Sequence, residues 1–378
     1  MRNAVIAGYA RSPFHFAGKG ALARVRPDDL AAEVLRGLIR KTGVPPADLE
    51  DLILGCAFPE GEQGLNVARL IGLLGDLPLS VGGMTVNRFC GSSMSAIHIA
   101  VGQINIGAGE AFICAGVESM SRVPIMGFNP LPNPALAQKT PGAYMSMGET
   151  AENVAVRHQI SREAQDAFAP NSQQKAAAAR AAGLLADEIV PITTKAGLVS
   201  EDGVIRPDTT AEGLAALKPA FDQAGTVTAG TSSPLTDGAS AVLVTSEDYA
   251  RAHQLEIVAR VVSVGVAGCA PEIMGIGPVG ATRKALERAS IGVGDLDVVE
   301  LNEAFASQAL ACINELGLKE ATLNIDGGAI ALGHPLGATG ARLVGKAASL
   351  LRRVGGRYAL ATQCIGGGQG IATVLERV

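Results

Sequence analysis

Residues 91–116, GSSMSAIHIAVGQINIGAGEAFICAG, are echoed by residues 337–362, GATGARLVGKAASLLRRVGGRYALAT, at an offset of about 246 positions. A shorter pair keeps nearly the same offset: residues 47–55 read ADLEDLILG and residues 294–301 read GDLDVVEL. Each long copy runs from a glycine turn through an amphipathic helix and a glycine stop into an apolar strand. The repeat therefore predicts two similar α/β halves, each with a parallel or mixed sheet covered by helices. We expect the halves to pack together, with their glycine turns meeting near a pseudo-twofold axis.

The segment before each repeat unit adds another helix. Asp28 is expected to cap a helix whose apolar stripe comprises Leu30, Val34, Leu35, Leu38 and Ile39. Residues 279–289 are its shorter counterpart in the second half.

Between the copies lies a stretch without a counterpart, residues 118–225, which we interpret as an inserted lid. It begins with a segment rich in Pro, Gly and Met and continues with helices expected over 148–158 and 161–182. Ser161 is the expected cap of the second helix, and Pro170 should kink or split it. The sequence thus divides into residues 1–117 with 226–250, the insertion 118–225, and residues 251–378. The methionines at 120, 126, 145 and 147 suit either an elongated apolar ligand or core packing.

Three glycine-rich turns carry side chains with chemistry: Cys90 in VNRFCGSSMSA, His334 in GGAIALGHPLGATGAR and Cys364 in ATQCIGGGQGIA. The helix expected after Cys90 places its sulfur at a helix N-terminus, where the dipole and unpaired amides favour thiolate. A lone cysteine before a helix is more often a small packed hydrophobe, and a lone histidine is often structural. Two thiols with one imidazole, however, suit acyl transfer with two proton transfers.

Composition excludes several classes of protein. The chain has 378 residues, 48% of them hydrophobic, and a net charge of −5 with scattered Lys and Arg, so neither nucleic acid nor an anionic membrane is an expected partner. No apolar run approaches membrane length, and the six cysteines show neither CxxC pairs nor zinc spacing. The N-terminus enters a strand without a signal-peptide core, and the chain ends in Glu-Arg-Val. We expect a cytoplasmic enzyme with reduced thiols and no bound metal.

Two further patterns resemble nucleotide-binding motifs and are interpreted as false matches. GIGPVG at 275–280 matches GxGxxG by letter but follows no clear strand, and GARLVGKA at 340–347 lacks the hydroxyl of a P-loop. Cys56, Cys114 and Cys312 lie in apolar runs and are expected to be inert, whereas Cys269 is left open. His98 and His158 receive no role.

These residues resemble the thiolase family over essentially the whole chain. NRFCGSSM, GTVTAGTSSPLTDGA, VVELNEAFA, NIDGGAIALGHPLGATGAR and CIGGGQG occur in the family's order and spacing. The resemblance implies the duplicated thiolase fold, with five αβαβα layers and an inserted loop domain. It also implies coenzyme A and acyl-CoA thioesters as substrates, no separate cofactor, and a homodimer or homotetramer.

The resemblance also implies roles for individual residues. Cys90 resembles the acylated nucleophile, His334 its base, and Cys364 the acid and base acting on the departing enolate. Asn302 resembles the residue whose bound water joins His334 in one oxyanion site, while the amides of Cys90 and Gly366 resemble a second. Coenzyme A contacts are implied for Arg206, Phe221, Ala229 and Ser233, and thioester-pocket contacts for Met147, Met274, Ala304 and Phe305.

The sequence departs from many biosynthetic thiolases, which carry His-Met where this chain has Ser146-Met147 and Asn-Ala-Ser where it has residues 231–233, Thr-Ser-Ser. The segment DGVIRPDTT and the C-terminal QGIATVLERV also resemble degradative members. We therefore expect a 3-ketoacyl-CoA thiolase of β-oxidation. The alternatives are an acetyl-CoA C-acetyltransferase that condenses two acetyl-CoA molecules, and a non-catalytic lipid carrier of the same fold.

Overall fold

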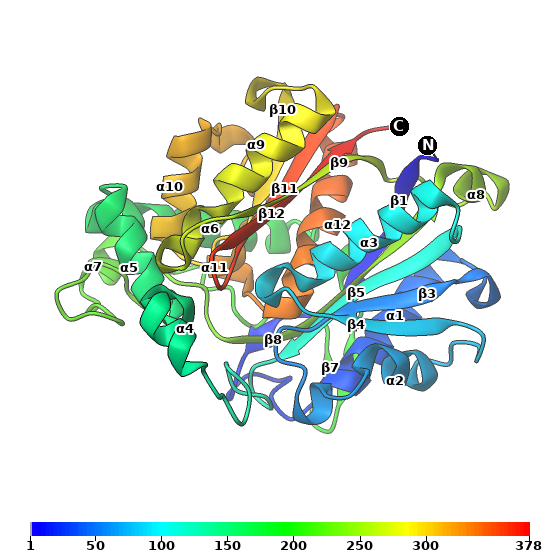
Figure 1. Cartoon of the computed structure of the whole chain (residues 1–378), viewed down its shortest axis with the longest axis horizontal. Coiled ribbons are helices and arrows are strands. Elements are labelled where there is room, and N and C mark those ends of the chain that lie inside the picture. The colour runs from blue at the N-terminus through cyan, green and yellow to red at the C-terminus, as the bar shows by residue number, and fades with distance from the viewer. Residues whose placement is uncertain (1) are drawn as a thin grey trace.

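The computed structural model describes residues 2–378 and consists of two sheets that enclose a layer of two helices (Figure 1). The elements of the first half are β1 (Ala4–Arg11), α1 (Pro27–Thr42), β3 (Asp51–Gly55), α2 (Val67–Leu74), β4 (Gly82–Val86), α3 (Ser92–Ile106), β5 (Ala111–Ser119) and β8 (Thr236–Ser246). Those of the second half are β9 (Ala259–Gly268), α9 (Gly277–Ala289), β10 (Leu296–Leu301), α10 (Ala306–Leu316), α12 (Leu336–Val354), β11 (Tyr358–Ile365) and β12 (Gln369–Glu376). Short elements complete both halves: β2 (His15–Phe16), α8 (Glu247–Ala252) and α11 (Ala329–Leu332).

Helices α3 and α12, which come from the two copies of the repeat, pack against each other between the sheets. Helices α1 and α2 cover the outer face of the first sheet, and α9 and α10 cover the outer face of the second. The expected duplicated α/β fold in five layers is therefore confirmed.

Both faces of the sheets are buried, which explains why the strands are apolar runs rather than alternating patterns. In β5, Phe112 and Cys114 belong to the central core, whereas Ile113, Ala115 and Val117 belong to the outer core under α1 and α2. The same alternation recurs in β11, where Ala359 and Ala361 face inward and Leu360 faces outward.

Glycines allow the two halves to approach each other closely. A Cβ added at Gly340 of α12 would lie 2.4 Å from the backbone nitrogen of Met94 in α3. A Cβ at Gly116 of β5 would lie 2.2 Å from the carbonyl oxygen of Gly337. The repeated glycine turns thus meet in backbone contact, as the sequence predicted.

The two sheets differ from expectation in one respect, because they are joined edge to edge. The strand order is β10-β11-β12-β9-β1-β8-β5-β3-β4, and the junction consists of the antiparallel pairs Val5↔Arg260 and Ile6↔Ala259 between β1 and β9. So short a pairing, between strands far apart in sequence, has no local signature that a sequence pattern could show.

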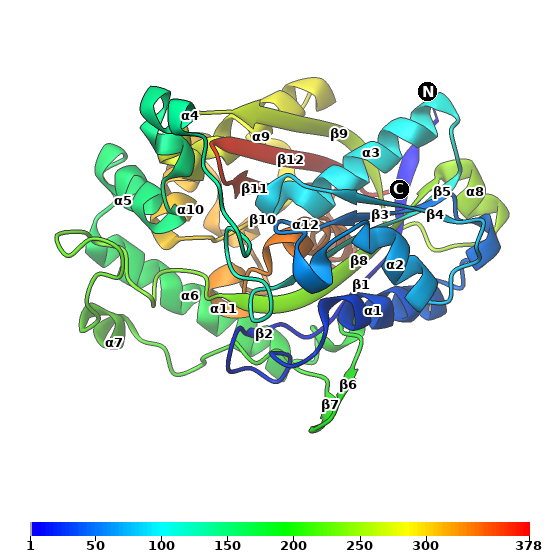
Figure 2. The same ribbon diagram turned by 60° about the horizontal axis from the view of Figure 1, so that its bottom comes forward.

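The segment between β5 and β8, which we expected to be an insertion, contains α4 (Pro134–Lys139), α5 (Met147–Arg157), α6 (Arg162–Ala181), the hairpin β6 (Ile192–Thr194) and β7 (Gly197–Val199), and α7 (Ala211–Ala215). Figure 2 shows its helices gathered at one end of the molecule, near α10. Ser161 caps α6 as expected, since its side chain accepts a hydrogen bond from the amide of Ala164.

Two local features differ from expectation. Pro170, expected to kink or split its helix, lies inside α6 and does not split it, because packing against α7, α10 and α11 holds the helix across the missing hydrogen bond. Helix α1 is capped at Arg26 rather than Asp28, because Pro27 occupies the first helical position. Asp28 lies in the first turn instead, where its carboxylate accepts from Arg26.

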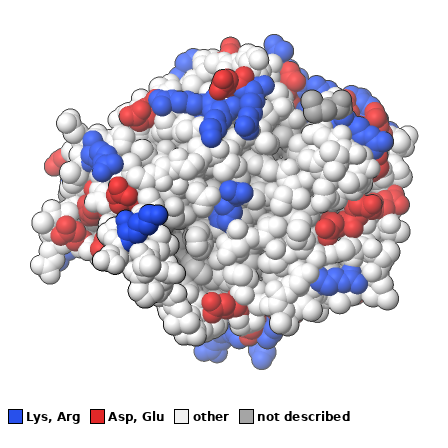
Figure 3. All heavy atoms as spheres, viewed as in Figure 1, with Lys and Arg blue, Asp and Glu red and all other residues white. Residues whose placement is uncertain are grey.

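The surface drawn in Figure 3 has a broad centre with few charged groups and basic side chains along its upper rim. Among the described residues, no helix is both long and apolar enough to span a bilayer.

Candidate active site

Cys90 lies in the single turn of 3-10 helix Phe89–Gly91 that leads directly into α3. The preceding residue, Phe89, has φ of 44°, a left-handed conformation that is strained for a residue with a side chain. This turn presents the Cys90 sulfur to the backbone amides of Cys90 itself and of Gly366, while the carbonyl of Cys90 accepts from the side chain of Gln363. The position of Cys90 is therefore fixed by contacts with both halves.

Burial raises the pKa of the Cys90 thiol to about 11, and the amides of Gly366 and Cys90 lower it only in part. The expectation that this site favours a resting thiolate is therefore wrong. The amides act as the sequence predicted, but the desolvation of a sulfur that is only 8% exposed outweighs them. A separate base is needed to remove the proton.

His334 lies in the loop between α11 and α12 and is 5% exposed. Its Nδ1 lies 2.6 Å from Oγ1 of Thr339, and its Nε2 lies 3.4 Å from Nδ2 of Asn302. Burial, aided by the charge of Arg342, lowers the pKa of His334 to about 3. The imidazole is therefore neutral near pH 7 and able to accept a proton.

Cys364 lies near the end of β11 and is 1% exposed. Burial raises the pKa of its thiol well above the usual value, and negative charge on Cys90 raises it further. Because Gly366, two residues later, directs its amide at the Cys90 sulfur, the second cysteine lies close to the first. At neutral pH Cys364 is a protonated thiol, the form required of an acid.

All four residues expected to line a thioester pocket pack around Cys364. Met147 of α5, Met274, Ala304 and Phe305 form one apolar cluster with its sulfur, together with Ala151 and Val227. Met147 is the one methionine of the inserted segment that joins this cluster. The insertion and the second half thus build a common apolar wall beside the two sulfurs.

The residues expected to contact coenzyme A are less closely assembled. Phe221 packs edge to face on Phe305, with ring centroids 5.9 Å apart, and the amide of Ser233 donates to the carbonyl of Ala304 at 2.9 Å. Ala229 is exposed, and Arg206 is half-buried with its amide bonded to the side chain of Gln173 at 2.7 Å. Among residues 2–378, Nε of Arg206 has no hydrogen-bond partner. The structure thus places Phe221 and Ser233 against the apolar wall and gives no contact that brings Arg206 or Ala229 to it.

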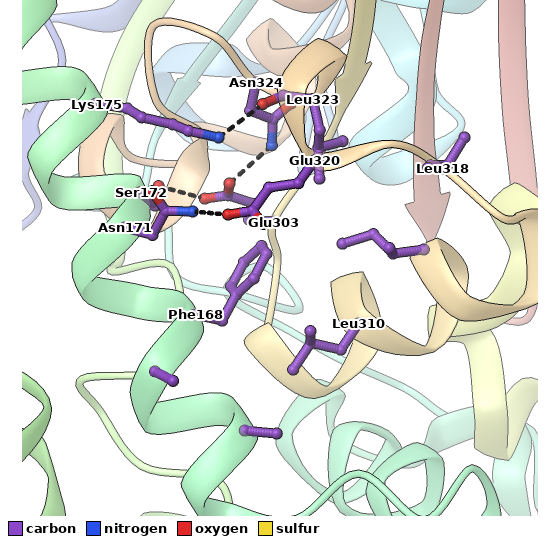
Figure 4. A pocket seen from close by; sticks show the side chains of 13 residues that line it. Phe168, Asn171, Ser172, Lys175, Glu303, Leu310, Leu318, Glu320, Leu323 and Asn324 are labelled. Carbon is purple, nitrogen blue, oxygen red and sulfur yellow. Dashed lines mark hydrogen bonds between the residues drawn. The ribbon is translucent and has the colours of Figure 1, made fainter.

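Asn302 follows β10 directly, and its backbone amide donates to the carbonyl of Thr362 at 3.0 Å. The next residue, Glu303, is 2% exposed and was missed by the sequence analysis. Its carboxylate accepts from Ser172 at 2.6 Å and from Asn324 at 2.7 Å (Figure 4). It also accepts from the amide of Ile330 at 3.2 Å. Glu303 thereby ties the loop of Asn302 to α6 and to the segment that leads to His334.

A cavity of 270 Å³ lies on the outer side of Glu303, between α6 and α10. Lys175 and Asn171 cross its mouth from α6, bonding to the carbonyl of Leu323 and to Glu320. Neither sulfur and neither His334 nor Asn302 lines this cavity. It lies behind the candidate site rather than within it.

A second buried carboxylate, Glu118, was also missed, although a lone acid within the apolar strand AFICAGVES is a visible signal. It accepts from the amides of Ala57 at 2.8 Å and Gly337 at 2.9 Å, and so joins the turn after β3 to the start of α12. Burial raises the pKa of Glu118, and these amides oppose the shift. Its contacts indicate a structural link between the halves.

The two segments interpreted as false matches to nucleotide-binding motifs belong to helices or lead into them. Residues 275–280 run into α9, where a Cβ at Gly277 would lie 2.0 Å from the carbonyl oxygen of Gln369, so this backbone packs on β12. Residues 340–347 lie within α12, and Lys346 pairs with Glu188 at 3.0 Å and Asp326 at 2.6 Å.

Cys56, Cys114 and Cys312 are buried, whereas Cys269 is partly exposed. Within the described chain, no cluster of three or more His, Cys, Asp or Glu has a metal-site arrangement.

Comparisons with known proteins agree with this architecture. Residues 4–248 match the thiolase N-terminal domain and residues 255–377 match the thiolase C-terminal domain. The chain is 48% identical over 389 residues to a 3-ketoacyl-CoA thiolase of Bacillus subtilis (strain 168) and 50% identical over 388 residues to one of Shewanella sp. (strain MR-7), with 100% of each chain covered.

Among solved structures, human mitochondrial 3-ketoacyl-CoA thiolase in complex with CoA is similar, with a TM-score of 0.92 and 39% sequence identity. The similarity covers 100% of this chain and 98% of the human one. With both domains matched and relatives near half identity over full length, the chain belongs to the thiolase family.

Proposed function

We propose that this chain is an acyltransferase that cleaves 3-ketoacyl-CoA with coenzyme A, giving acetyl-CoA and a shortened acyl-CoA. The observation that carries the proposal is the meeting of two segments at one sulfur, since the amide of Gly366, two residues after Cys364, is directed at Cys90. The neutral imidazole of His334 supports it, because His334 lies just before α12, which packs against the turn that holds Cys90. The names of the full-length relatives support the same reaction.

In the first half-reaction, Nε2 of His334 removes the proton from Cys90, and the sulfur attacks the 3-keto carbon. The bond between C2 and C3 then breaks, its electron pair forms the enolate of acetyl-CoA, and the thiol of Cys364 protonates C2. Acetyl-CoA leaves, and the remaining acyl group stays on the Cys90 sulfur.

In the second half-reaction, the thiolate of Cys364 takes the proton of the coenzyme A thiol, which attacks the acyl carbonyl. The Cys90 sulfur departs and recovers its proton from His334, so both cysteines and the imidazole return to their starting forms. Each cycle consumes one 3-ketoacyl-CoA and one coenzyme A, and it releases one acetyl-CoA and one shortened acyl-CoA.

Two oxyanions form during this sequence, and two sets of donors suit them. The amides of Cys90 and Gly366 flank the sulfur that bears the acyl group, so they are proposed to stabilise the tetrahedral intermediate. Protonated His334 and a water held by Asn302 are proposed to stabilise the enolate oxygen. Oδ1 of Asn302 is buried and has no partner in the described part of the chain, which leaves an acceptor for such a water.

The inserted segment 118–225 is proposed to act as the lid and, with Phe221, Ala229 and Ser233, to bind coenzyme A. Arg206, a half-buried residue, is proposed to meet a phosphate of the nucleotide with its guanidinium charge. Met147, Met274, Ala304 and Phe305 are proposed to contact the thioester. Coenzyme A is a substrate in this scheme, and no further cofactor or metal enters it.

We propose that the protein is a homodimer or homotetramer that works in β-oxidation in the cytoplasm. Several large apolar side chains are exposed on the first half and the insertion, among them Leu79 (80%), Phe128 (60%) and Leu131 (84%). A second copy of the chain would cover such groups. Sedimentation velocity tests this part of the proposal, since a monomer at micromolar concentration would contradict it.

The activity itself is tested with 3-ketoacyl-CoA substrates of increasing chain length and free coenzyme A. We expect thiolysis of acetoacetyl-CoA and of longer substrates. Activity restricted to acetoacetyl-CoA would favour the acetyltransferase alternative, and absence of both activities in folded protein would favour a carrier.

A further inference from the structure

Thr339 makes the shorter of the two hydrogen bonds of the His334 ring in residues 2–378, and the family resemblance assigned it no role. Its Oγ1 lies 2.6 Å from Nδ1 of His334, and both residues are buried, at 1% and 5% exposure. Thr339 belongs to the first turns of α12, and its hydroxyl also lies 3.3 Å from the carbonyl oxygen of Pro335, four residues earlier.

The protons at these atoms can be assigned from their partners. The threonine hydroxyl has one proton, and it donates that proton to the carbonyl of Pro335, as threonine side chains within helices commonly do to the residue four positions earlier. Oγ1 then accepts a hydrogen bond from Nδ1, which places the imidazole proton on Nδ1. Nε2 is left with its lone pair and faces the Nδ2 donor of Asn302 at 3.4 Å. Both contacts of the ring agree with one tautomer.

We propose that Thr339 is a positioning residue that holds His334 in the Nδ1–H tautomer, so that Nε2 is the atom that removes the proton from Cys90. The inference rests on the proposed function and specifies which nitrogen acts as the base. In the opposite tautomer Nε2 would carry a proton, and the buried ring could not accept one from the thiol at that atom.

The backbone around His334 is anchored independently of this hydroxyl. The amide of His334 donates to Oγ1 of Thr236 at 3.1 Å, and the amide of Gly337 donates to Glu118 at 2.9 Å. Loss of the Thr339 hydroxyl should therefore leave the loop in place and free only the ring. That separation makes a chemical role distinguishable from a structural one.

Thr339→Val removes the hydroxyl with little change in the shape of the side chain. Thr339→Ser keeps the hydroxyl and removes only the methyl group. The acetylation rate of Cys90 by acetyl-CoA is measured by rapid quenching and intact mass, with KM for acetyl-CoA and the melting temperature determined alongside. We expect Thr339→Val to slow acetylation about 10- to 100-fold with KM nearly unchanged, because orienting a general base through a second residue has effects of this size. Thr339→Ser should acetylate at nearly the wild-type rate.

Folded Thr339→Val that acetylates as fast as wild type would overturn the proposal, as would Thr339→Ser that is as slow as the valine variant. If the wild-type protein itself forms no acetyl adduct, the proposed function fails instead. Should the valine variant not fold, ¹⁵N spectra of histidine-labelled wild-type protein decide the matter. The chain has five histidines, and His334→Asn identifies the signals of interest. A protonated Nδ1 with a bare Nε2 is expected, and the reverse pattern would overturn the inference.

Discussion

The amide of Gly366 is directed at the sulfur of Cys90, although the two residues belong to opposite halves of the duplicated fold. The contact exists because β11 ends at Ile365, so the following turn emerges beside the start of α3. One amide from each half therefore flanks the Cys90 sulfur, and both halves are needed to form this arrangement.

Gly366→Ala tests this relationship, because the added Cβ would lie 3.5 Å from Sδ of Met147 and 3.7 Å from Phe89, distances of ordinary contact. We expect the melting temperature to change little while thiolysis falls, since the methyl group narrows the space around the sulfur. Gly368→Ala is the matched control. Its φ of 84° and a Cβ only 2.4 Å from the carbonyl oxygen of Cys269 should cost about 1 to 3 kcal/mol of stability. Equal losses of stability in the two variants would contradict this distinction.

Cys364→Ala should separate the two half-reactions. Acetylation of Cys90 by acetyl-CoA is the reverse of the second half-reaction. It protonates no carbon, and coenzyme A can depart as a thiolate without the proton of Cys364, so the adduct should still form, although more slowly than in wild type. Thiolysis of a 3-ketoacyl-CoA should fall by about 10² to 10⁴, the usual contribution of an acid or base in proton transfer. Intact mass and steady-state rates measure both effects. The control is Cys312→Ala, which alters a buried cysteine of α10 that donates to the carbonyl of Gly275. This variant is expected to retain thiolysis.

The pH dependence of Cys90 alkylation follows from its raised pKa of about 11 in the free enzyme. Only the thiolate reacts, so the rate with iodoacetamide should rise about tenfold for each pH unit and show no plateau between pH 7 and 9. The lowered pKa of His334, about 3, adds no inflection near pH 6.5, since the ring is neutral on both sides of that value. A plateau below pH 8 would show that the thiolate is favoured at rest.

Glu303→Gln probes the link behind Asn302. The variant replaces one carboxylate oxygen by a donor in a site where Ser172, Asn324 and the amide of Ile330 all donate. We expect a loss of about 1 to 3 kcal/mol of unfolding free energy, because a buried donor is left opposite another donor. Glu320→Gln is the control, as Glu320 is exposed at the mouth of the same cavity and should be nearly neutral. Chemical denaturation of both variants measures the difference.

Much of the fold was predictable because the repeat, the apolar strands and the glycine turns are local patterns that burial on both sheet faces requires. Features that depend on contacts between residues far apart in the sequence could not be predicted. The pairing of β1 with β9 and the unbroken helix at Pro170 depend on contacts outside any sequence window. The shift of the first helix start is different, since Pro27 itself is a visible signal for the first helical position.

The same division holds at the site. Cys90, His334 and Cys364 stand out in sequence because reactive residue types in glycine turns are unusual. Thr339 and Glu303 look ordinary in sequence. Thr339 gains its importance from the hydrogen bond to His334, and Glu303, next to Asn302, gains it from the bonds to α6 and to the amide of Ile330. The direction of the Cys90 pKa shift was missed because the helix terminus is visible in a sequence and the extent of burial is not.

The central claim is that Cys90 carries the acyl group, and intact mass spectrometry after incubation with acetyl-CoA tests it most directly. Wild-type protein and Cys269→Ala, which alters the partly exposed cysteine, should each gain one acetyl group, and folded Cys90→Ala should gain none. Absence of the adduct from folded wild-type protein, or its persistence in Cys90→Ala, would contradict the claim.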